Sequence, residues 1–236
     1  GGGSARFRQT LLARLERLVD PVQPLPAPAP APVTARAPTP AATTRAEAFD
    51  VVAIGASTGG IHALGQVLRA IPAEFRQPIL VTQHLPVSFM PYFAAQLSLL
   101  AGRPADVAAD RMRVRRGRVI VAPGDAHLRC VALPDGGMAV RLTNERVPSG
   151  CLPSVDPMLS SLAQVHGARA LGIILSGMGR DGAEGARILH EVGGCVLAQD
   201  RASSVVWGMP GAVSPFADAL LSPEAIGTLV AAGCRP

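Results

Sequence analysis

Short apolar runs alternate with amphipathic segments along the chain from about residue 49 onward. Four runs are apolar at most consecutive positions, as in strands buried on both faces, at 50–54, 78–82, 170–175 and 195–198. Apolar residues at helical spacing predict four helices: one ending near residue 70, two over about 88–100 and 155–166, and one ending near 192. The alternation predicts an α/β fold with a parallel sheet covered by helices on both sides.

Residues 106–142 break this alternation. They hold several short strand-like pieces in place of one long apolar run. Asp135-Gly136-Gly137 is a turn sequence of the kind that joins two antiparallel strands. We therefore predict a β-hairpin that is added to the mainly parallel sheet.

The first 47 residues carry a different pattern. Apolar residues at helical spacing, among them Phe7 and Leu11, predict an amphipathic helix within residues 1–20. Residues 21–47 begin with prolines that mostly alternate with alanine, which predicts an extended linker because proline interrupts helices and central strands. The compact domain is then predicted over residues 48–232.

The basic residues narrow the chemistry that the chain can perform. All 22 of them are arginine, and no lysine occurs in the sequence. This excludes the phosphate-binding P-loop and the lysine-based Schiff-base and kinase mechanisms. Arginine stays protonated in proteins and cannot act as a base. Any catalysis must therefore rest on Ser, Thr, Cys, His, Asp, Glu, Tyr or a metal.

Charge and aromatic content argue against a nucleic-acid partner. The formal net charge of +5 is a mild excess, and 3% aromatic residues are too few for a base-stacking surface. The four cysteines are far apart and form no Cys-x-x-Cys pair: Cys130, Cys151, Cys195 and Cys234. With no signal peptide or long apolar span in the sequence, we predict a cytoplasmic protein with reduced cysteines and no direct membrane insertion.

Three polar residues are candidates for catalysis because each follows a predicted strand. Ser57 comes after the first strand, His84 directly after the second, and Asp181 within the turn after the third long one. Loops at the carboxyl ends of parallel strands share one edge of the sheet, so these side chains can converge. A serine nucleophile, a histidine base and an orienting carboxylate are the components of a hydrolase triad.

Each candidate also has a structural interpretation. Ser57 and Asp181 could cap the helices that follow them, and His84 could be a histidine that only packs in the fold. The other four histidines do not follow strands in this way. No spacing of His and Cys predicts a zinc site, so we expect no metal.

The turn at Gly177–Gly182 favours a second hypothesis. It matches the pattern G-x-G-x-x-G, follows a predicted strand and opens a helix. Asp200 lies near the distance at which such sites carry an acid that binds the ribose. A dinucleotide-dependent α/β enzyme is therefore an alternative on pattern alone. That hypothesis leaves Ser57 and His84 without a role and predicts that they do not converge with Asp181.

Six motifs in chain order carry a more specific signal than one glycine pattern. They span residues 54–60, 83–86, 122–128, 153–156, 176–182 and 208–210. Their sequences are IGASTGG, QHLP, APGDAHL, PSVD, SGMGRDG and GMP. Over roughly residues 49–232, this succession resembles the catalytic domain of the chemotaxis protein-glutamate methylesterases, the CheB family.

The resemblance implies a doubly wound α/β/α sandwich and a serine hydrolase. It implies as substrates the glutamate γ-methyl esters of methyl-accepting chemotaxis receptors, with deamidation of receptor glutamines as a second activity. The family's motifs assign Ser57 as nucleophile, His84 as base and Asp181 as orienting acid. Thr58 and Met178 fall at active-site positions, where Met178 is expected to stabilise an oxyanion through its backbone N–H. No cofactor is implied.

The chain departs from the family pattern at Ile61, Leu152 and Arg201, and in its N-terminal segment. The family's usual form carries a receiver domain that covers the active site until it is phosphorylated. Residues 1–47 are too few for that domain, so we expect this partner to be absent from this chain, with residues 1–20 as its remnant or as a docking helix. A catalytically silent signalling module of the same fold is a further alternative, and it predicts binding without turnover.

Overall fold

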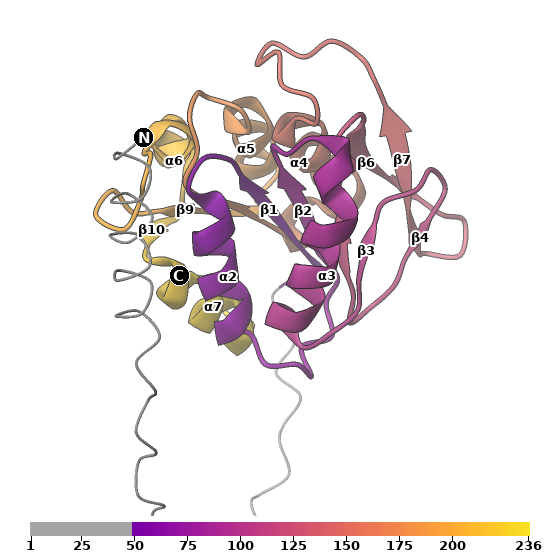
Figure 1. Ribbon diagram of the computed structural model, residues 1–236, viewed down its shortest axis with the longest axis horizontal. Coiled ribbons are helices and arrows are strands. Elements are labelled where there is room, and N and C mark those ends of the chain that lie inside the picture. Colours follow the sequence, from indigo (N-terminus) through magenta and orange to yellow (C-terminus); the bar gives the residue numbers. More distant parts are fainter. Residues whose placement is uncertain (1–48) are drawn as a thin grey trace, which may run out of the picture. The chain divides into compact units, whose positions relative to one another are not determined.

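A seven-stranded parallel sheet runs through the part of the chain that the computed structural model describes, residues 49–236 (Figure 1). Its order is β10-β9-β8-β1-β2-β5-β3, and every neighbouring pair is parallel. The strands are β1 (Val51–Ala56), β2 (Ile79–Gln83), β3 (Ala105–Val107), β5 (Val119–Val121), β8 (Ala170–Ile174), β9 (Cys195–Gln199) and β10 (Ala219–Leu221). The helix predicted at 1–20 and the linker predicted at 21–47 lie outside the described residues.

Helices cover both faces of this sheet because its strands are apolar on both sides. Side chains alternate along β1, so that Val52 faces one helix layer and Val51 the other. The first layer, drawn in front of the sheet in Figure 1, holds α2 (Gly60–Ala70), α3 (Met90–Ala101) and α7 (Pro223–Ala232). The second holds α4 (Val155–His166), α5 (Ala183–Glu191) and α6 (Gly208–Val213). The predicted α/β/α sandwich is confirmed.

A separate antiparallel sheet of three strands packs beside α4. Its order is β4-β7-β6, with β4 (Arg113–Val114), β6 (His127–Ala132) and β7 (Met138–Thr143). The predicted hairpin is β6–β7, and the Asp135 carboxylate in its turn accepts a hydrogen bond from the backbone N–H of Gly137 at 3.0 Å. Strand β4 lies within residues 106–142, where short strand-like pieces are predicted, but its own position and its pairing with β7 are not predicted. Leu128 and Val140 of the hairpin share a buried cluster with Leu159 of α4.

Three elements near the C-terminus are missing from the sequence-based prediction, namely α6, β10 and α7. Helix α6 has two glycines and a proline within six residues, and β10 has three residues at the sheet edge, so their sequence signals are weak. Helix α7 does carry a start signal, because Ser222 caps it before Pro223. The helix predicted from residue 88 begins at Met90, after the 3-10 turn η1 (Val87–Phe89). Two further 3-10 turns are η2 (Gly167–Arg169) and η3 (Ser214–Phe216).

The direction in which strands are added to the sheet reverses beside β1. Strands β2, β5 and β3 lie on one side of β1, whereas β8, β9 and β10 lie on the other. In open α/β sheets, ligands bind outside the carboxyl ends of the strands at such a reversal. The loops after β1, β2 and β8 therefore form the expected position of a site. Among the described residues, no helix is long and apolar enough to cross a membrane.

Candidate active site

Ser57 lies one residue beyond β1, and its backbone is held by both neighbouring strand ends. Its N–H donates to the backbone oxygen of Ser176 at 3.0 Å, after β8. Its carbonyl accepts hydrogen bonds from the Gln83 side-chain amide at 3.0 Å and from the N–H of Gly60 at 2.9 Å. These bonds fix the position of the Ser57 hydroxyl at the reversal point of the sheet.

His84 follows β2 directly and bridges the other two candidate residues. Its backbone N–H donates to the carbonyl of Ala56 at 3.2 Å, which extends the pairing of β1 with β2. Its ring Nδ1 lies 3.1 Å from Ser57 Oγ, and its Nε2 lies 2.8 Å from Asp181 Oδ2. With the proton on Nε2 and shared with the carboxylate, Nδ1 keeps a lone pair that accepts the serine proton.

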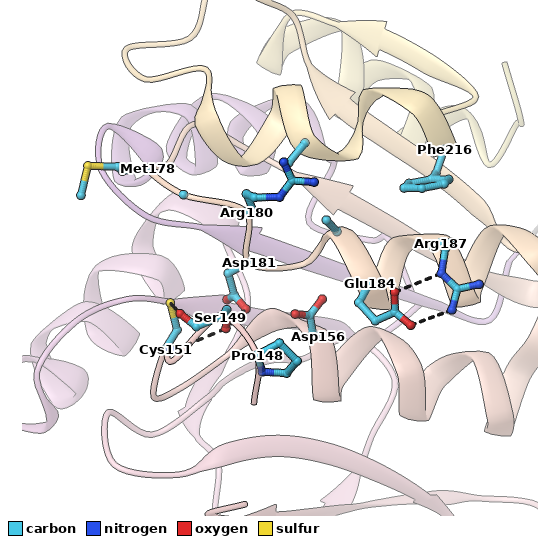
Figure 2. A pocket seen from close by; sticks show the side chains of 13 residues that line it. Pro148, Ser149, Cys151, Asp156, Met178, Arg180, Asp181, Glu184, Arg187 and Phe216 are labelled. Carbon is cyan, nitrogen blue, oxygen red and sulfur yellow. Dashed lines mark hydrogen bonds and ion pairs between the residues drawn. The ribbon is translucent and has the colours of Figure 1, made fainter. Parts of the chain in front are cut away.

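Asp181 is buried in the turn between β8 and α5, and four donors surround its carboxylate. Oδ2 accepts from His84 and from the backbone N–H of Val155 at 2.8 Å. Oδ1 accepts from the hydroxyls of Ser149, at 2.8 Å, and Ser154. Figure 2 shows Ser149 beside this carboxylate. Burial alone raises the pKa of Asp181, but the hydrogen bonds, led by that of His84, outweigh it and hold the pKa below its usual value.

A second group of residues holds Asp181 in place and is missed by reasoning from strand ends. Ser154 caps α4 by accepting from the N–H of Asp156 at 3.2 Å, while its hydroxyl donates to Asp181. Its own N–H donates to Nδ1 of the buried His127 at 2.9 Å, and Nε2 of that ring donates to the Glu145 carbonyl. A serine before the helix is a cap signal in the sequence, but nothing local indicates that its hydroxyl also faces Asp181.

The helix-capping interpretations of Ser57 and Asp181 are wrong. The residues at the N-cap positions of α2 and α5 are Gly59 and Gly182, and neither cap involves a side-chain hydrogen bond. Asp181 instead accepts from the first N–H of α4, a different helix. Both side chains therefore point to His84 and not to the helices that follow them in sequence.

The glycine-rich turn at Gly177–Gly182 has a steric explanation that needs no nucleotide. A Cβ at Gly177 would lie 2.3 Å from Sδ of Met209 and 2.9 Å from Cβ of Ser57, so only glycine lets these turns approach so closely. The Asp200 carboxylate accepts from the N–H and the hydroxyl of Ser203, both at 2.8 Å, and so is engaged within its own turn. The dinucleotide hypothesis predicted no convergence of the three candidates, and they do converge.

Thr58 directly follows Ser57, and Met178 follows Gly177, where an added Cβ would lie 2.9 Å from Cβ of Ser57. Neither Thr58 nor Met178 has a hydrogen-bond acceptor for its backbone N–H within residues 49–236, whereas the amide of Ser57 is already bonded to Ser176. The side chain of Met178 is exposed and points away from Asp181 (Figure 2). Any polar contribution of Met178 therefore comes from its backbone, because a thioether has no hydrogen to donate.

Two hollows flank the Ser57–His84–Asp181 group. One, of about 580 Å³, is lined by Ser57, Thr58 and His84 together with residues of α2 and α3. The other, of about 520 Å³ and shown in Figure 2, is lined by Asp181, Cys151 and residues of α5. Ser57 thus lines the first hollow, and Asp181 lines the second.

Comparison with known proteins finds one family whose sequence pattern matches most of this chain. A sequence model described as CheB methylesterase matches residues 52–230. The solved structure of the Thermotoga maritima CheB methylesterase catalytic domain is 33% identical, with a TM-score of 0.75, over 78% of this chain and 98% of that chain.

Full-length relatives are longer than this chain. A protein-glutamate methylesterase/protein-glutamine glutaminase of Maricaulis maris (strain MCS10) is 46% identical over 186 residues, 78% of this chain and 45% of that protein. The protein-glutamate methylesterase/protein-glutamine glutaminase 2 of Caulobacter vibrioides (strain ATCC 19089 / CIP 103742 / CB 15) is 37% identical over 237 residues. That alignment covers 99% of this chain and 67% of that protein. The chain thus spans between about half and two thirds of these relatives.

Proposed function

We propose that this chain, which belongs to the CheB methylesterase family, is a serine hydrolase. It would act on carboxylic esters of protein glutamate side chains. Its substrates would be the γ-methyl esters of methyl-accepting chemotaxis receptors; the names of its relatives, protein-glutamate methylesterase/protein-glutamine glutaminase, support the glutamate ester as the reacting group. The observation that carries the proposal is the continuous hydrogen-bonded path from Ser57 through His84 to Asp181.

The first half of the reaction forms an ester on Ser57. The hydroxyl attacks the ester carbonyl while Nδ1 of His84 takes its proton, and the ionised Asp181 stabilises the imidazolium that results. The depressed pKa of Asp181 supports this role, because the carboxylate stays charged and does not itself take the proton. Methanol leaves when His84 returns the proton to the methoxide oxygen, and a glutamyl ester of Ser57 remains.

The negative charge of the tetrahedral intermediate needs hydrogen-bond donors. We assign this role to the backbone amides of Met178 and Thr58, since both are free of protein acceptors within residues 49–236. The amide of Ser57 is excluded because it donates to Ser176. Donors of this kind typically stabilise the transition state by about 3–4 kcal/mol each.

The second half of the reaction hydrolyses the glutamyl ester. His84 removes a proton from water, water attacks the acyl carbon, and Ser57 leaves with the proton that His84 returns. The products are a glutamate carboxylate and the free enzyme. A glutamine side chain would follow the same course, with ammonia leaving in place of methanol.

The proposal also covers the setting of the reaction. We assign residues 48–232 as the catalytic domain, residues 21–47 as a linker and the cytoplasm as the place of action. The partners would be receptors, without insertion of this chain into the membrane, and a receiver domain where one is present.

The test uses receptor fragments that carry glutamate γ-methyl esters, glutamines, or unmodified glutamates as a control. We expect methanol from the first, ammonia from the second and no product from the third, with no added dinucleotide. Receptor binding without either product would indicate the silent signalling module instead. Turnover that required a dinucleotide would contradict the proposal in favour of the cofactor-dependent enzyme.

A further inference from the structure

Cys151 lies beside His84 and Asp181, although the proposed hydrolysis does not use it. Its sulfur, one ring nitrogen of His84 and one carboxylate oxygen of Asp181 all lie within 4.8 Å of one another. Figure 2 shows the thiol next to the Asp181 carboxylate, at the second hollow. Within residues 49–236, no other group of three His, Cys, Asp or Glu side chains meets in this way.

We infer that these three side chains form an inhibitory binding site for Zn²⁺. Imidazole nitrogen, thiolate sulfur and carboxylate oxygen are the three kinds of ligand that Zn²⁺ takes from proteins. Ligand atoms at zinc-ligand distances of about 2.0–2.3 Å in a tetrahedron lie roughly 3.3–3.8 Å from one another. Any pair of ligand atoms farther apart than this therefore needs to approach by at most about 1–1.5 Å. If Nε2 of His84 is the ligand, it and Asp181 Oδ2, now 2.8 Å apart, must instead separate slightly. Water from the open hollow supplies the fourth ligand.

The Cys151 side chain is suited to make that approach. It is half-buried, and its sulfur contacts the backbone oxygen of Ser149 at 3.8 Å, a weak interaction that a metal bond would readily replace. Asp181 and His84, in contrast, are positioned by their backbones and by further hydrogen bonds to Asp181, although the bond between the two side chains would break when Zn²⁺ binds. The site thus combines two positioned ligands with one that adjusts.

Zinc at this position would prevent His84 from accepting the Ser57 proton, whichever ring nitrogen binds the ion. If Nδ1 of His84 binds the ion, the lone pair that accepts the Ser57 proton is used directly. If Nε2 binds it, the ring proton moves to Nδ1, which then can no longer accept a proton. The ion also competes with His84 for the Asp181 carboxylate.

Binding of Zn²⁺ requires no oxidant or reductant. Zn²⁺ replaces the proton of the Cys151 thiol, which is released to solvent, and a zinc–sulfur bond forms. The imidazole binds as the neutral base and the carboxylate as the anion. A chelator reverses the step, so that inhibition by zinc is expected to be reversible.

The experiment measures metal binding and inhibition in the whole chain and in two matched cysteine variants. Cys151→Ser removes the proposed sulfur ligand, and Cys234→Ser removes the other half-buried thiol, far from the site in sequence. Co²⁺ is the spectroscopic probe, because bonding to a thiolate produces charge-transfer absorption. Zn²⁺ is the inhibitor in the methanol-release assay, with chelator-treated protein as the reference.

We expect thiolate-to-cobalt absorption in the unaltered chain and in Cys234→Ser, but not in Cys151→Ser. The Zn²⁺ concentration for half-inhibition should rise at least about tenfold in Cys151→Ser, since even loss of an outer-shell partner costs 10–100-fold in metal affinity. Equal absorption or equal inhibition in the two variants would overturn the inference. The inhibition arm rests on the proposed function; if no methanol is released at all, the cobalt arm still decides whether the site exists.

Discussion

Asp181 shows how a buried carboxylate remains charged at the proposed centre of catalysis. Each of its oxygens has two donors, and these come from residues that are distant in the sequence. Ser154 is one of them and joins the cap of α4 to this carboxylate. The position of His84 therefore depends on the Ser154 side chain, which has no hydrogen bond to Ser57 among the described residues.

Ser154→Ala is expected to lower kcat because Asp181 loses one hydrogen bond and holds His84 less firmly. We expect about a tenfold decrease, which corresponds to about 1.4 kcal/mol in the activation free energy. Ser161→Ala is the matched control, since Ser161 is a buried serine of the same helix that bonds to Cys130 and Met158 and not to Asp181. Equal decreases in kcat for both variants would show that Ser154 acts only through stability.

The contribution of Asp156 to the stability of the fold is expected to be smaller at neutral pH than at mildly acidic pH. Burial raises its pKa to about 6, despite a hydrogen bond from the N–H of Gly185. The folded chain therefore binds this proton more tightly than the unfolded chain, and stability falls as the pH rises from about 4 to about 6.

Asp156→Asn keeps an acceptor for Gly185 and removes that charge. We expect it to raise the free energy of unfolding at pH 8 by about 1–3 kcal/mol and to change it little near pH 3.5. Denaturant titrations at the two pH values measure this. Asp50→Asn is the control, and its expected change in the free energy of unfolding at pH 8 has the opposite sign. Hydrogen bonds from Arg169 lower the pKa of Asp50, so the ionised carboxylate stabilises the fold and its removal should destabilise it. A destabilised Asp156→Asn at pH 8 would contradict the assignment.

At the residue level, the sequence predicts that three candidate side chains meet, because their positions after parallel strands bring them to one edge of the sheet. Ser57, His84 and Asp181 are identified because each follows a strand of a parallel sheet, and the structure brings all three together. Ser149, Ser154 and His127 are not identified, because their roles depend on contacts across 18 or more residues. No local pattern encodes which carboxylate a serine hydroxyl will face.

Helices α4 and α5 must pack closely for the site to form, since the first presents Ser154 and the second follows the Asp181 turn. Gly185 of α5 makes this possible: a Cβ there would lie 2.8 Å from the backbone oxygen of Asp156 and 2.8 Å from Cβ of Leu159. The contact involves backbone and the root of a side chain, neither of which can rotate away.

Gly185→Ala is expected to destabilise the fold by about 1–3 kcal/mol, the usual cost of overpacking. Gly65→Ala in α2 is the matched control, because the nearest atom to its Cβ would be the end of the flexible Arg69 side chain at 3.4 Å. That control should gain about 0.5–1 kcal/mol from improved helix propensity. Thermal unfolding of both variants tests this, and equal gains would rule out the tight contact.

Element-level prediction is good where apolar runs are long and poor where elements are short. Helix α4 spans the predicted 155–166, and β1, β2, β8 and β9 begin within one residue of their predicted starts. Helix α6 and strand β10 are stabilised by packing in the assembled sandwich and not by their own sequences. The hairpin is found from its turn at Asp135, but the two-residue β4 has no turn or periodicity to reveal it.

At the scale of the whole molecule, the reversal of strand order beside β1 explains why one edge of the sheet carries the chemistry. The loops after β1, β2 and β8 are adjacent only because β8 pairs with β1 on the side opposite β2. The sequence alone predicts a parallel sheet but not this order. The family resemblance implies a doubly wound sandwich, in which the order reverses, but it does not say which strands lie beside the reversal.

The most direct test of the central claim is methanol release from methylated receptor by Ser57→Ala. If Ser57 is the nucleophile, turnover should fall by at least about 10³-fold relative to the unaltered chain, as for other triads. Unchanged thermal unfolding would show that the fold is intact, which is expected because the Ser57 backbone makes the contacts with Ser176 and Gln83. Undiminished methanol release by a folded Ser57→Ala chain would contradict the account.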